Sequence, residues 1–213
     1  MIRYICLLMI SLTFCPLFSF AQSVRMPSDT VINFTLPSDR WDVSVDPPHA
    51  AIEAMVAHMV YDRQKNGAKF DIEELRATSK KLNKVNNLFI YNAGTEAYLL
   101  FSFSPHSRSE KPLSEKLIRN SVKWTIGALN DNAGVSDLNS YQTTVEPVEI
   151  PGIEYAQQVT SNNPLFGDPH KFIGVIGYAY PYWVFLYYNE KVKNSTDFSE
   201  MQQILKSIKL SAP

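Results

Sequence analysis

The sequence predicts a single domain of the α+β class. Apolar residues recur at helical spacing in residues 52–60 and again in residues 113–129. From Asn139 onward the pattern changes to extended segments that are separated by turn residues. Neither an internal repeat nor a flexible linker divides the chain, so we expect one domain over residues 31–213.

The N-terminal segment has the features of a secretory signal. Arg3 precedes an apolar run from Tyr4 to about Phe14, and Ser19 and Ala21 stand at the −3 and −1 positions of a signal-peptidase site. The apolar run is shorter than the roughly 20 residues that span a bilayer, which disfavours a membrane anchor. We therefore expect a signal peptide over residues 1–21, cleavage after Ala21, and a periplasmic or secreted protein.

Both cysteines of the chain, Cys6 and Cys15, lie in this leader. Lipoprotein processing at Cys15 is the alternative, although the bulky Phe14 stands where such signals have a small residue. After cleavage behind Ala21 the mature chain has no cysteine, so its core must stabilise it without disulfides. A chain of this size buries enough surface for that.

The charge balance gives no reason to expect a nucleic-acid partner. The chain has 20 basic and 21 acidic side chains, and its one basic cluster is formed by Lys80, Lys81 and Lys84. These lysines recur at helical spacing, which is typical of a solvated helix face.

The first part of the mature chain predicts a flexible lead-in followed by two strands. Residues 22–30 are polar and contain a proline, so we expect them to be flexible. Residues 31–36 (VINFTL) predict a strand, and a turn then leads to a second short strand over Trp41–Val45.

Residues 47–86 predict a helical insertion of two helices. Asp46 is the expected cap of the first helix, and Asn66-Gly67 ends it. Asp71 and Glu74 form a capping-box-like pair that opens the second helix. The expected inward positions are Ile52, Met55, Val56, Met59 and Val60 on the first helix, and Ile72, Leu75 and Leu82 on the second.

Two strands and a long helix come next. Leu88–Tyr91 and Ala97–Ser104 predict strands around the turn Asn92-Ala93-Gly94. The helix is expected to begin at Pro112 and to end before Gly134. Its apolar side consists of Leu113, Leu117, Ile118, Val122, Thr125, Ile126 and Leu129.

The last third of the chain predicts antiparallel strands and a closing helix. Extended segments flank the turn Pro151-Gly152, and residues 162–169 predict a loop. Asp197, with Glu200 three residues later, is the expected cap of the last helix. Phe198, Met201, Leu205 and Ile208 form the expected buried face of that helix.

An aromatic stretch, GYAYPYWVFLYY, covers Gly177–Tyr188. Proline cannot occupy a central strand, so Pro181 divides the stretch into a hairpin. Both strands are apolar on both faces, which predicts a central pair that is covered on each side.

The aromatic side chains are therefore interpreted mainly as core residues. An alternative is that some of them line a groove or reach the surface near the turn, where they bind a partner or a small apolar ligand. The candidate binding residues are Tyr178, Tyr180, Tyr182, Trp183 and His170.

No motif of a hydrolase or of a metal site is present, and no cofactor is expected. His49 and His58 are nine residues apart, which places them on opposite sides of one helix, and His106 lies in a polar loop segment. Asp168 could orient His170, but no nucleophile is evident beside them. The carboxylate pairs Glu73–Glu74 and Glu146–Glu149 are expected on the surface.

Three segments resemble the PsbP-like family, which includes the bacterial DcrB-like proteins. FTLPSDRWDVSV is similar to the opening strand of the family, AYLLFSFSPHSRSEKPLSEKLIRNSV to its central strand and long helix, and FSEMQQILKSIKL to its last helix. The resemblance implies an α/β/α sandwich with a central, mostly antiparallel sheet. Residues 47–86 form a larger insertion than the family pattern has. Family members act mostly by binding, as scaffolds, assembly factors and adaptors.

These observations favour an exported, non-catalytic binding or assembly protein of the bacterial envelope. The expected partner is another envelope protein or a small apolar ligand, and we expect neither nucleic-acid binding nor a membrane-spanning segment. One alternative is a periplasmic immunity-type protein that neutralises a toxin. Another is an envelope hydrolase that uses Asp168 and His170.

Overall fold

The computed structural model describes residues 19–26, 29–83, 86–105, 114–132, 143–165, 168–191 and 195–211. At 128–132, 162–165, 168–171, 191 and 195 it describes the backbone alone. Most of the predicted signal peptide lies outside the described residues, so this segment stays a prediction. The same holds for the predicted helix start at Pro112 and for the positions of Lys84, His106 and Leu113.

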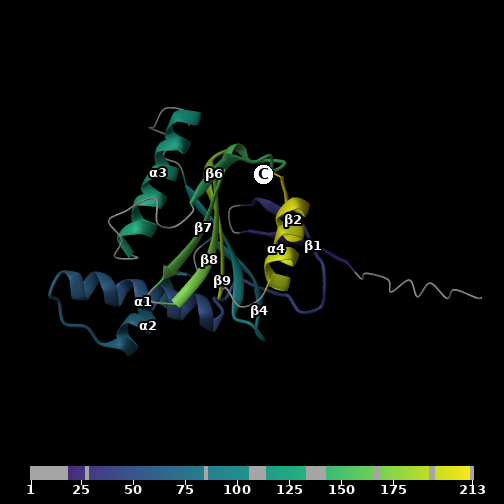
Figure 1. Cartoon of the computed structure of the whole chain (residues 1–213). Helices are drawn as coiled ribbons and strands as arrows, with labels where there is room; N and C mark the ends of the chain where they lie inside the picture. Colours follow the sequence, from purple (N-terminus) through teal and green to yellow (C-terminus); the bar gives the residue numbers. More distant parts are fainter. Residues whose placement is uncertain are drawn as a thin grey trace, which may run out of the picture.

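The described residues form two antiparallel sheets and four helices (Figure 1). The smaller sheet has the order β1-β2-β10 and the larger one the order β3-β4-β5-β9-β8-β7-β6. The strands are β1 (Phe20–Arg25), β2 (Val31–Leu36), β3 (Asp42–Ser44), β4 (Asn87–Asn92), β5 (Ala97–Pro105), β6 (Thr144–Pro147), β7 (Glu154–Leu165), β8 (Asp168–Ala179), β9 (Tyr182–Lys191) and β10 (Lys209–Ser211). The helices are α1 (His49–Lys65), α2 (Ile72–Leu82), α3 (Glu115–Asn132) and α4 (Ser195–Ser207).

The large sheet forms the middle layer of the molecule. In Figure 1, α3 and the α1–α2 pair lie on one side of it, and α4 lies on the other side together with the small sheet. The predicted α+β fold class, with helices packed on a central antiparallel sheet, is therefore confirmed.

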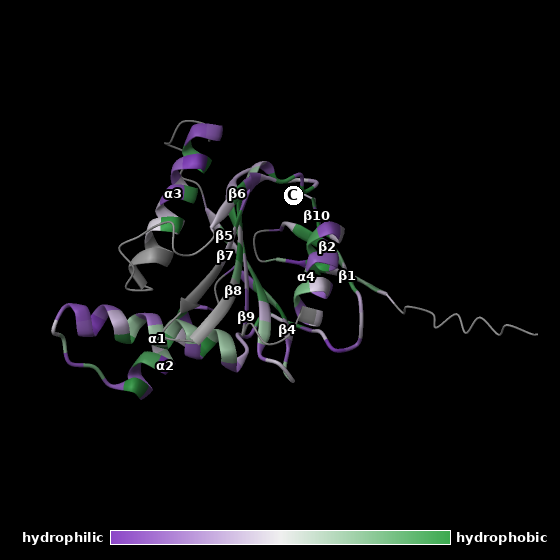
Figure 2. Cartoon of the chain, in the orientation of Figure 1, coloured by the Kyte–Doolittle hydropathy of each residue, from purple (hydrophilic) through white to green (hydrophobic). Residues whose placement is uncertain are grey.

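Among the described side chains, three hydrophobic clusters hold these layers together. The largest lies between the large sheet, the small sheet and α4, and it includes Phe34, Trp41, Phe101, Tyr188 and Met201. A second cluster joins α3 to β7 and β8, and a third joins the start of α1 to β4 and β5. Figure 2 shows hydrophobic residues along the strands of the large sheet and a hydrophilic outer end of α1.

The aromatic stretch forms the centre of the large sheet. It makes up the end of β8, a turn with a cis peptide bond between Tyr180 and Pro181, and most of β9. On β9, Val184, Leu186 and Tyr188 belong to the largest cluster, while Trp183, Phe185 and Tyr187 pack on the α3 side. The predicted central hairpin with both faces covered is confirmed.

The lead-in predicted over residues 22–30 is wrong in its first half. Residues 20–25 form β1, which pairs with β2 from Phe20↔Leu36 to Arg25↔Val31, and Met26 is buried. An edge strand is held by backbone hydrogen bonds and needs few apolar side chains, so its polar composition did not reveal it. A chain that begins at Gln22 keeps the pairs from Gln22↔Phe34 onward.

The loop predicted over residues 162–169 is also wrong. β7 and β8 continue to pair through Asn162↔Lys171 and Pro164↔Pro169 as far as Leu165↔Asp168. Backbone pairing between two long neighbouring strands extends past their apolar segments, which a composition-based prediction does not detect.

Two of the three predicted helix caps differ from the structure. α1 begins at His49 after Pro48, which makes no side-chain cap bond, so Asp46 is not its cap. Asp197 lies inside the first turn of α4 rather than before it. Asp71 does cap α2, because its side chain accepts hydrogen bonds from the backbone N–H groups of Glu73 and Glu74.

The helical insertion is covered less than its apolar pattern predicts. Of the expected inward positions, Val56 and Leu75 are buried, while Ile72 and Leu82 are exposed. The start of α1 packs on Phe89 and Tyr98, and the rest of the pair extends beyond the sheet (Figure 1). Because the two helices pack mainly on each other, no further layer covers the rest of their apolar faces.

The turn at Gly152 joins the two sheets. Leu210 of β10 donates its backbone N–H to the carbonyl of Pro151 at 2.9 Å. Gly152 has φ +87°, and a Cβ atom there would lie 2.2 Å from the carbonyl oxygen of Leu210. This close approach therefore requires glycine.

We predict that Gly152→Ala lowers the free energy of unfolding by about 3 kcal/mol, because it combines backbone strain with a backbone clash. Gly67→Ala is the matched control, since Gly67 has φ +63° and a Cβ atom added there would meet no other atom within 4 Å. It should cost about 1 kcal/mol. Urea denaturation of both variants measures the difference, and equal losses would contradict the prediction.

Candidate functional site

Four of the five predicted binding residues meet at the turn between β8 and β9. Tyr178 and Trp183 are register partners, and the rings of Tyr178 and Tyr180 pack edge to face with centroids 6.4 Å apart. Tyr182 points to the opposite face and packs edge to face on Phe103 at 6.4 Å. Tyr180 is 69% exposed, whereas Tyr178 is buried and Tyr182 half-buried. We call these four residues the aromatic turn.

The aromatic turn has a rigid base. The rings of Trp183, Phe185 and Tyr187 stack along β9, with centroids 6.1 Å and 6.0 Å apart. The hydroxyl of Tyr187 is hydrogen-bonded to Thr125 of α3. Side chains that are stacked and hydrogen-bonded in this way lose little freedom when a partner binds.

Burial raises the pKa of several tyrosines in the large sheet. The pKa of Tyr187 rises to about 12 through burial, against the opposing effect of the Thr125 hydrogen bond. Burial likewise raises the pKa of Tyr98 to about 12, although the amide of Asn189 donates to its hydroxyl at 3.2 Å. Burial also raises the pKa of Tyr178, and the proximity of Tyr180 and Glu154 raises it further. These hydroxyls stay protonated at neutral pH.

The fifth predicted residue, His170, lies away from the aromatic turn. It pairs with Asn163 and Lys191, eight residues before Tyr178 on β8, which is about 27 Å along an extended strand. The side chains of His170 and Asp168 are outside the described atoms, so the hydrolase hypothesis stays a prediction.

The two described histidines of α1 do not form a metal site. His49 Nε2 lies 3.9 Å from Glu53 Oε1, and His58 Nε2 lies 3.5 Å from Asp62 Oδ2. Within the described part of the chain, no group of three histidine, cysteine, aspartate or glutamate residues is placed to hold a metal ion.

A groove of about 470 Å³ lies next to the aromatic turn, between the first turn of α3 and the end of the β6–β7 hairpin. Its outer lip includes Tyr155, which is 46% exposed and has φ +55°. Tyr155 follows Glu154, the register partner of Tyr178, at an irregularity in the pairing of β7 with β8. The turn at Pro151-Gly152 was predicted, but this bulge carries no sequence signature and was missed.

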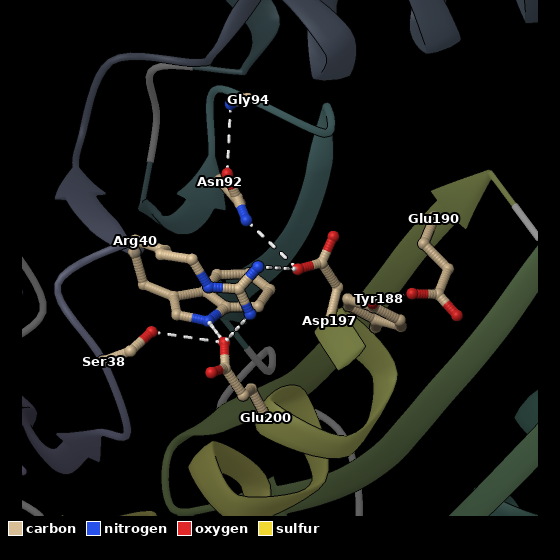
Figure 3. Close-up of polar contacts among 9 residues, drawn as sticks. Ser38, Arg40, Asn92, Gly94, Tyr188, Glu190, Asp197 and Glu200 are labelled. Carbon is tan, nitrogen blue, oxygen red and sulfur yellow. Dashed lines mark hydrogen bonds and ion pairs between the residues drawn. The ribbon is translucent and has the colours of Figure 1, made fainter. Parts of the chain in front are cut away.

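A buried polar cluster was missed as well (Figure 3). Asp197 of α4 is fully buried, lies 3.2 Å from the guanidinium of Arg40, and accepts a 3.1 Å hydrogen bond from Asn92. Glu200 accepts hydrogen bonds from Arg40 at 2.5 Å and from the indole N–H of Trp41 at 2.7 Å. We call these residues the α4 anchor.

The second part of the cluster lies on β9. Glu190 is buried and accepts a hydrogen bond from the hydroxyl of Tyr188. Burial raises the pKa of Tyr188 strongly, and the hydrogen bond to Glu190 and the charges of Glu190, Asp197 and Glu200 raise it further.

The α4 anchor holds α4 against the rest of the fold. Glu200 Oε2 faces three donors, because Ser38 adds a 3.3 Å hydrogen bond to those of Arg40 and Trp41. The cluster thus fastens α4 to the segment between β2 and β3 and to the end of β4.

The comparisons with known proteins leave the family open. No protein-family model matches the chain, and no curated protein matches its sequence. The PsbP-like resemblance therefore stays a prediction. Among the described helices, none combines the length and the apolar character needed to cross a membrane.

We predict that alkaline pH destabilises the protein through its buried tyrosines. Tyr98 and Tyr187 have a pKa of about 12 in the folded state against 10.0 for an unperturbed tyrosine. Their contribution is complete below pH 10 and is lost as the pH rises through about 12. Tyr98→Phe and Tyr187→Phe should each move the midpoint of alkaline unfolding to higher pH, measured by circular dichroism and by absorbance at 295 nm. A midpoint that stays in place in both variants would contradict this.

We predict that Asp197→Ala lowers the free energy of unfolding by about 3 kcal/mol, because Arg40 and Asn92 both lose their buried partner. The matched control is Glu73→Ala, which removes an exposed carboxylate from the 2.5 Å ion pair with Arg76. That variant should change stability little. Chemical denaturation compares the two, and a similar effect in both would show that the α4 anchor does not stabilise the fold.

Proposed function

We propose that the protein is an exported, non-catalytic binding or assembly protein of the bacterial envelope, and that its partner docks on the aromatic turn. The observation that carries this proposal is the 69% exposure of Tyr180 above a base of stacked and buried aromatic rings. Exposed tyrosines on a rigid base are typical of the residues that dominate binding energy at protein interfaces.

Two further aromatic side chains are exposed, one next to the register partner of Tyr178 and one on the outer side of α3. Tyr155 is 46% exposed on β7, and Trp124 is 81% exposed on α3. α3 packs on the large sheet through Ile118 and Val122. Trp124 follows Val122 by two residues, which is about 200° around the helix, so it points away from the sheet.

The position of Trp124 also gives a reason to expect a partner. A tryptophan that stays in water keeps a large apolar surface hydrated, which is unfavourable by about 25 cal/mol per Å². Contiguous exposed apolar patches commonly mark interaction sites, and a docked partner that covered Trp124 would remove this cost. The aromatic turn, Tyr155 and Trp124 thus favour binding as the function.

The test is capture of the partner by purified protein that begins at Gln22. The bait is immobilised in envelope extract, and the captured proteins are compared between the parent and single variants. Tyr180→Ala and Trp124→Ala should each reduce capture of a dominant envelope protein about tenfold or more, without a change in thermal stability. Both side chains are exposed, so neither truncation leaves a cavity.

Phe70→Ala is the matched control, because Phe70 is also exposed but lies in the distant segment between α1 and α2. It should capture the partner as the parent does. Equal capture by the parent and by the Tyr180 and Trp124 variants would exclude this surface. Retention of a small apolar compound in place of a protein would favour the ligand-binding alternative.

A further inference from the structure

We propose that the groove beside the aromatic turn binds a cationic, extended peptide segment of the partner protein. This inference rests on the proposed function and specifies which part of the partner the groove receives. The groove is lined by Glu115, Pro147, Val148, Glu149, Ile150, Pro151, Ile153, Tyr155, Ala156 and Gln157.

The floor of the groove is apolar and fixed in place. Ile150, Ile153 and Ala156 are buried members of the largest hydrophobic cluster. Ile153 packs so closely on the sheet that a Cβ atom at Gly177 would lie 2.2 Å from its side chain. A preformed apolar floor can receive an aliphatic side chain with little rearrangement.

The walls of the groove are held by backbone hydrogen bonds. Val148 donates to Ala156 at 3.1 Å, and Ile153 donates to Ile150 at 2.9 Å. Tyr155 stands at the rim in the left-handed region of φ, a conformation that costs roughly 1–2 kcal/mol for a residue other than glycine. The bulge at this position turns the ring outward, since Tyr155 is exposed while its neighbour Ala156 is buried.

The charge of the groove favours a cationic ligand. Among the described residues that line it, Glu115 and Glu149 are acidic, and none is basic. Glu115 already pairs with Arg119 at 2.5 Å, so Glu149 is the carboxylate that we expect to face the ligand. Residues 143–165 contain three glutamates and no lysine or arginine. The ring of Tyr155 can add a cation–π contact.

The adjacent strand favours an extended peptide over a small cation. Among the described strands, β6 is the edge of the large sheet, and all four of its residues are exposed. Val148 donates its backbone N–H to Ala156 of β7. Because backbone groups alternate in direction along an antiparallel strand, the N–H and C=O of Glu146 point toward β7 and those of Val145 point away from it. The backbone N–H and C=O of Val145 and the C=O of Pro147 thus face outward, where an added strand can pair with them.

The two features together specify the ligand. A strand added to β6 places alternate side chains toward the groove, where an aliphatic residue meets Ile150 and a lysine or arginine meets Glu149. β6 has few outward-facing backbone groups for hydrogen bonds to an added strand, because Pro147 has no N–H. Side-chain contacts in the groove must therefore supply much of the selectivity.

The test uses the whole mature chain and a fluorescein-labelled peptide with the sequence Lys-Thr-Val-Thr-Lys-Thr-Val, in which lysine and valine alternate along one face of the extended strand. Fluorescence anisotropy should show saturable binding that weakens with added salt. Glu149→Lys should reduce the affinity about tenfold or more, and it should gain affinity for the matched peptide with glutamate in place of lysine. N-methylation of alternate peptide bonds, which blocks strand pairing, should weaken binding as well.

The matched control is Asp42→Lys, which makes the same charge change at an exposed position on β3, the opposite edge of the same sheet. It should bind the lysine peptide within about twofold of the parent. No binding, equal losses in both variants, or insensitivity to N-methylation would overturn the proposal.

This outcome is separable from that of the proposed function. If Tyr180→Ala abolishes capture of the envelope partner while Glu149→Lys leaves it intact, the binding function stands and the peptide site is wrong. If both variants lose the partner and Glu149→Lys alone loses the lysine peptide, both proposals are supported.

Discussion

The whole architecture depends on the position of β9 in the middle of the large sheet. β9 pairs with β5 on one side and with β8 on the other, so its own backbone has no exposed edge. Its alternate side chains enter different clusters, Leu186 toward α4 and Phe185 toward α3. The side chains of β9 thus reach the clusters on both faces of the sheet, although α3 packs mainly on β7 and β8, and the aromatic turn connects β9 directly to β8. The aromatic turn is therefore held in place by the two central strands that it connects.

The sequence was sufficient for the elements that bury apolar residues in a regular pattern. The central hairpin, β4, β5 and the buried positions Ile118 and Val122 of α3 were predicted, because their side chains alternate or repeat at the period of the structure they form, whereas Leu117 was expected on the same face and is exposed. β1 and the far ends of β7 and β8 were not, because there the backbone ladder decides the conformation and the side chains give no pattern. For the α1–α2 pair the sequence predicted too much burial. The apolar faces of both helices are regular, but the helices extend beyond the sheet and part of these faces stays exposed.

The candidate site was predictable in part for the same reason. The aromatic residues at the turn stood out, and Pro181 placed the turn correctly. The exposure of Trp124 could have been predicted, because Trp124 lies outside the apolar stripe of α3. The exposure of Tyr155 could not, because it depends on a β-bulge for which the neighbouring residues give no sequence signal. The α4 anchor could not be assembled from the sequence, because Arg40 and Glu200 are 160 residues apart and meet only when the layers close. Asp197 and Glu200 were noticed, but the spacing alone suggested a helix cap.

The small sheet has a consequence for the order in which the molecule is completed. β2 is its middle strand, and it pairs with β1 from the same end of the chain and with β10 from the other end. Ile32 and Leu210 are register partners although nearly the whole chain separates them. Contacts of such long sequence separation form slowly, because a large loop must close first. During synthesis, β1 and β2 can pair early, but the small sheet cannot be completed until β10 has emerged. This late completion is compatible with the proposed export of the chain, because the protein would stay partly unfolded until its last strand is made.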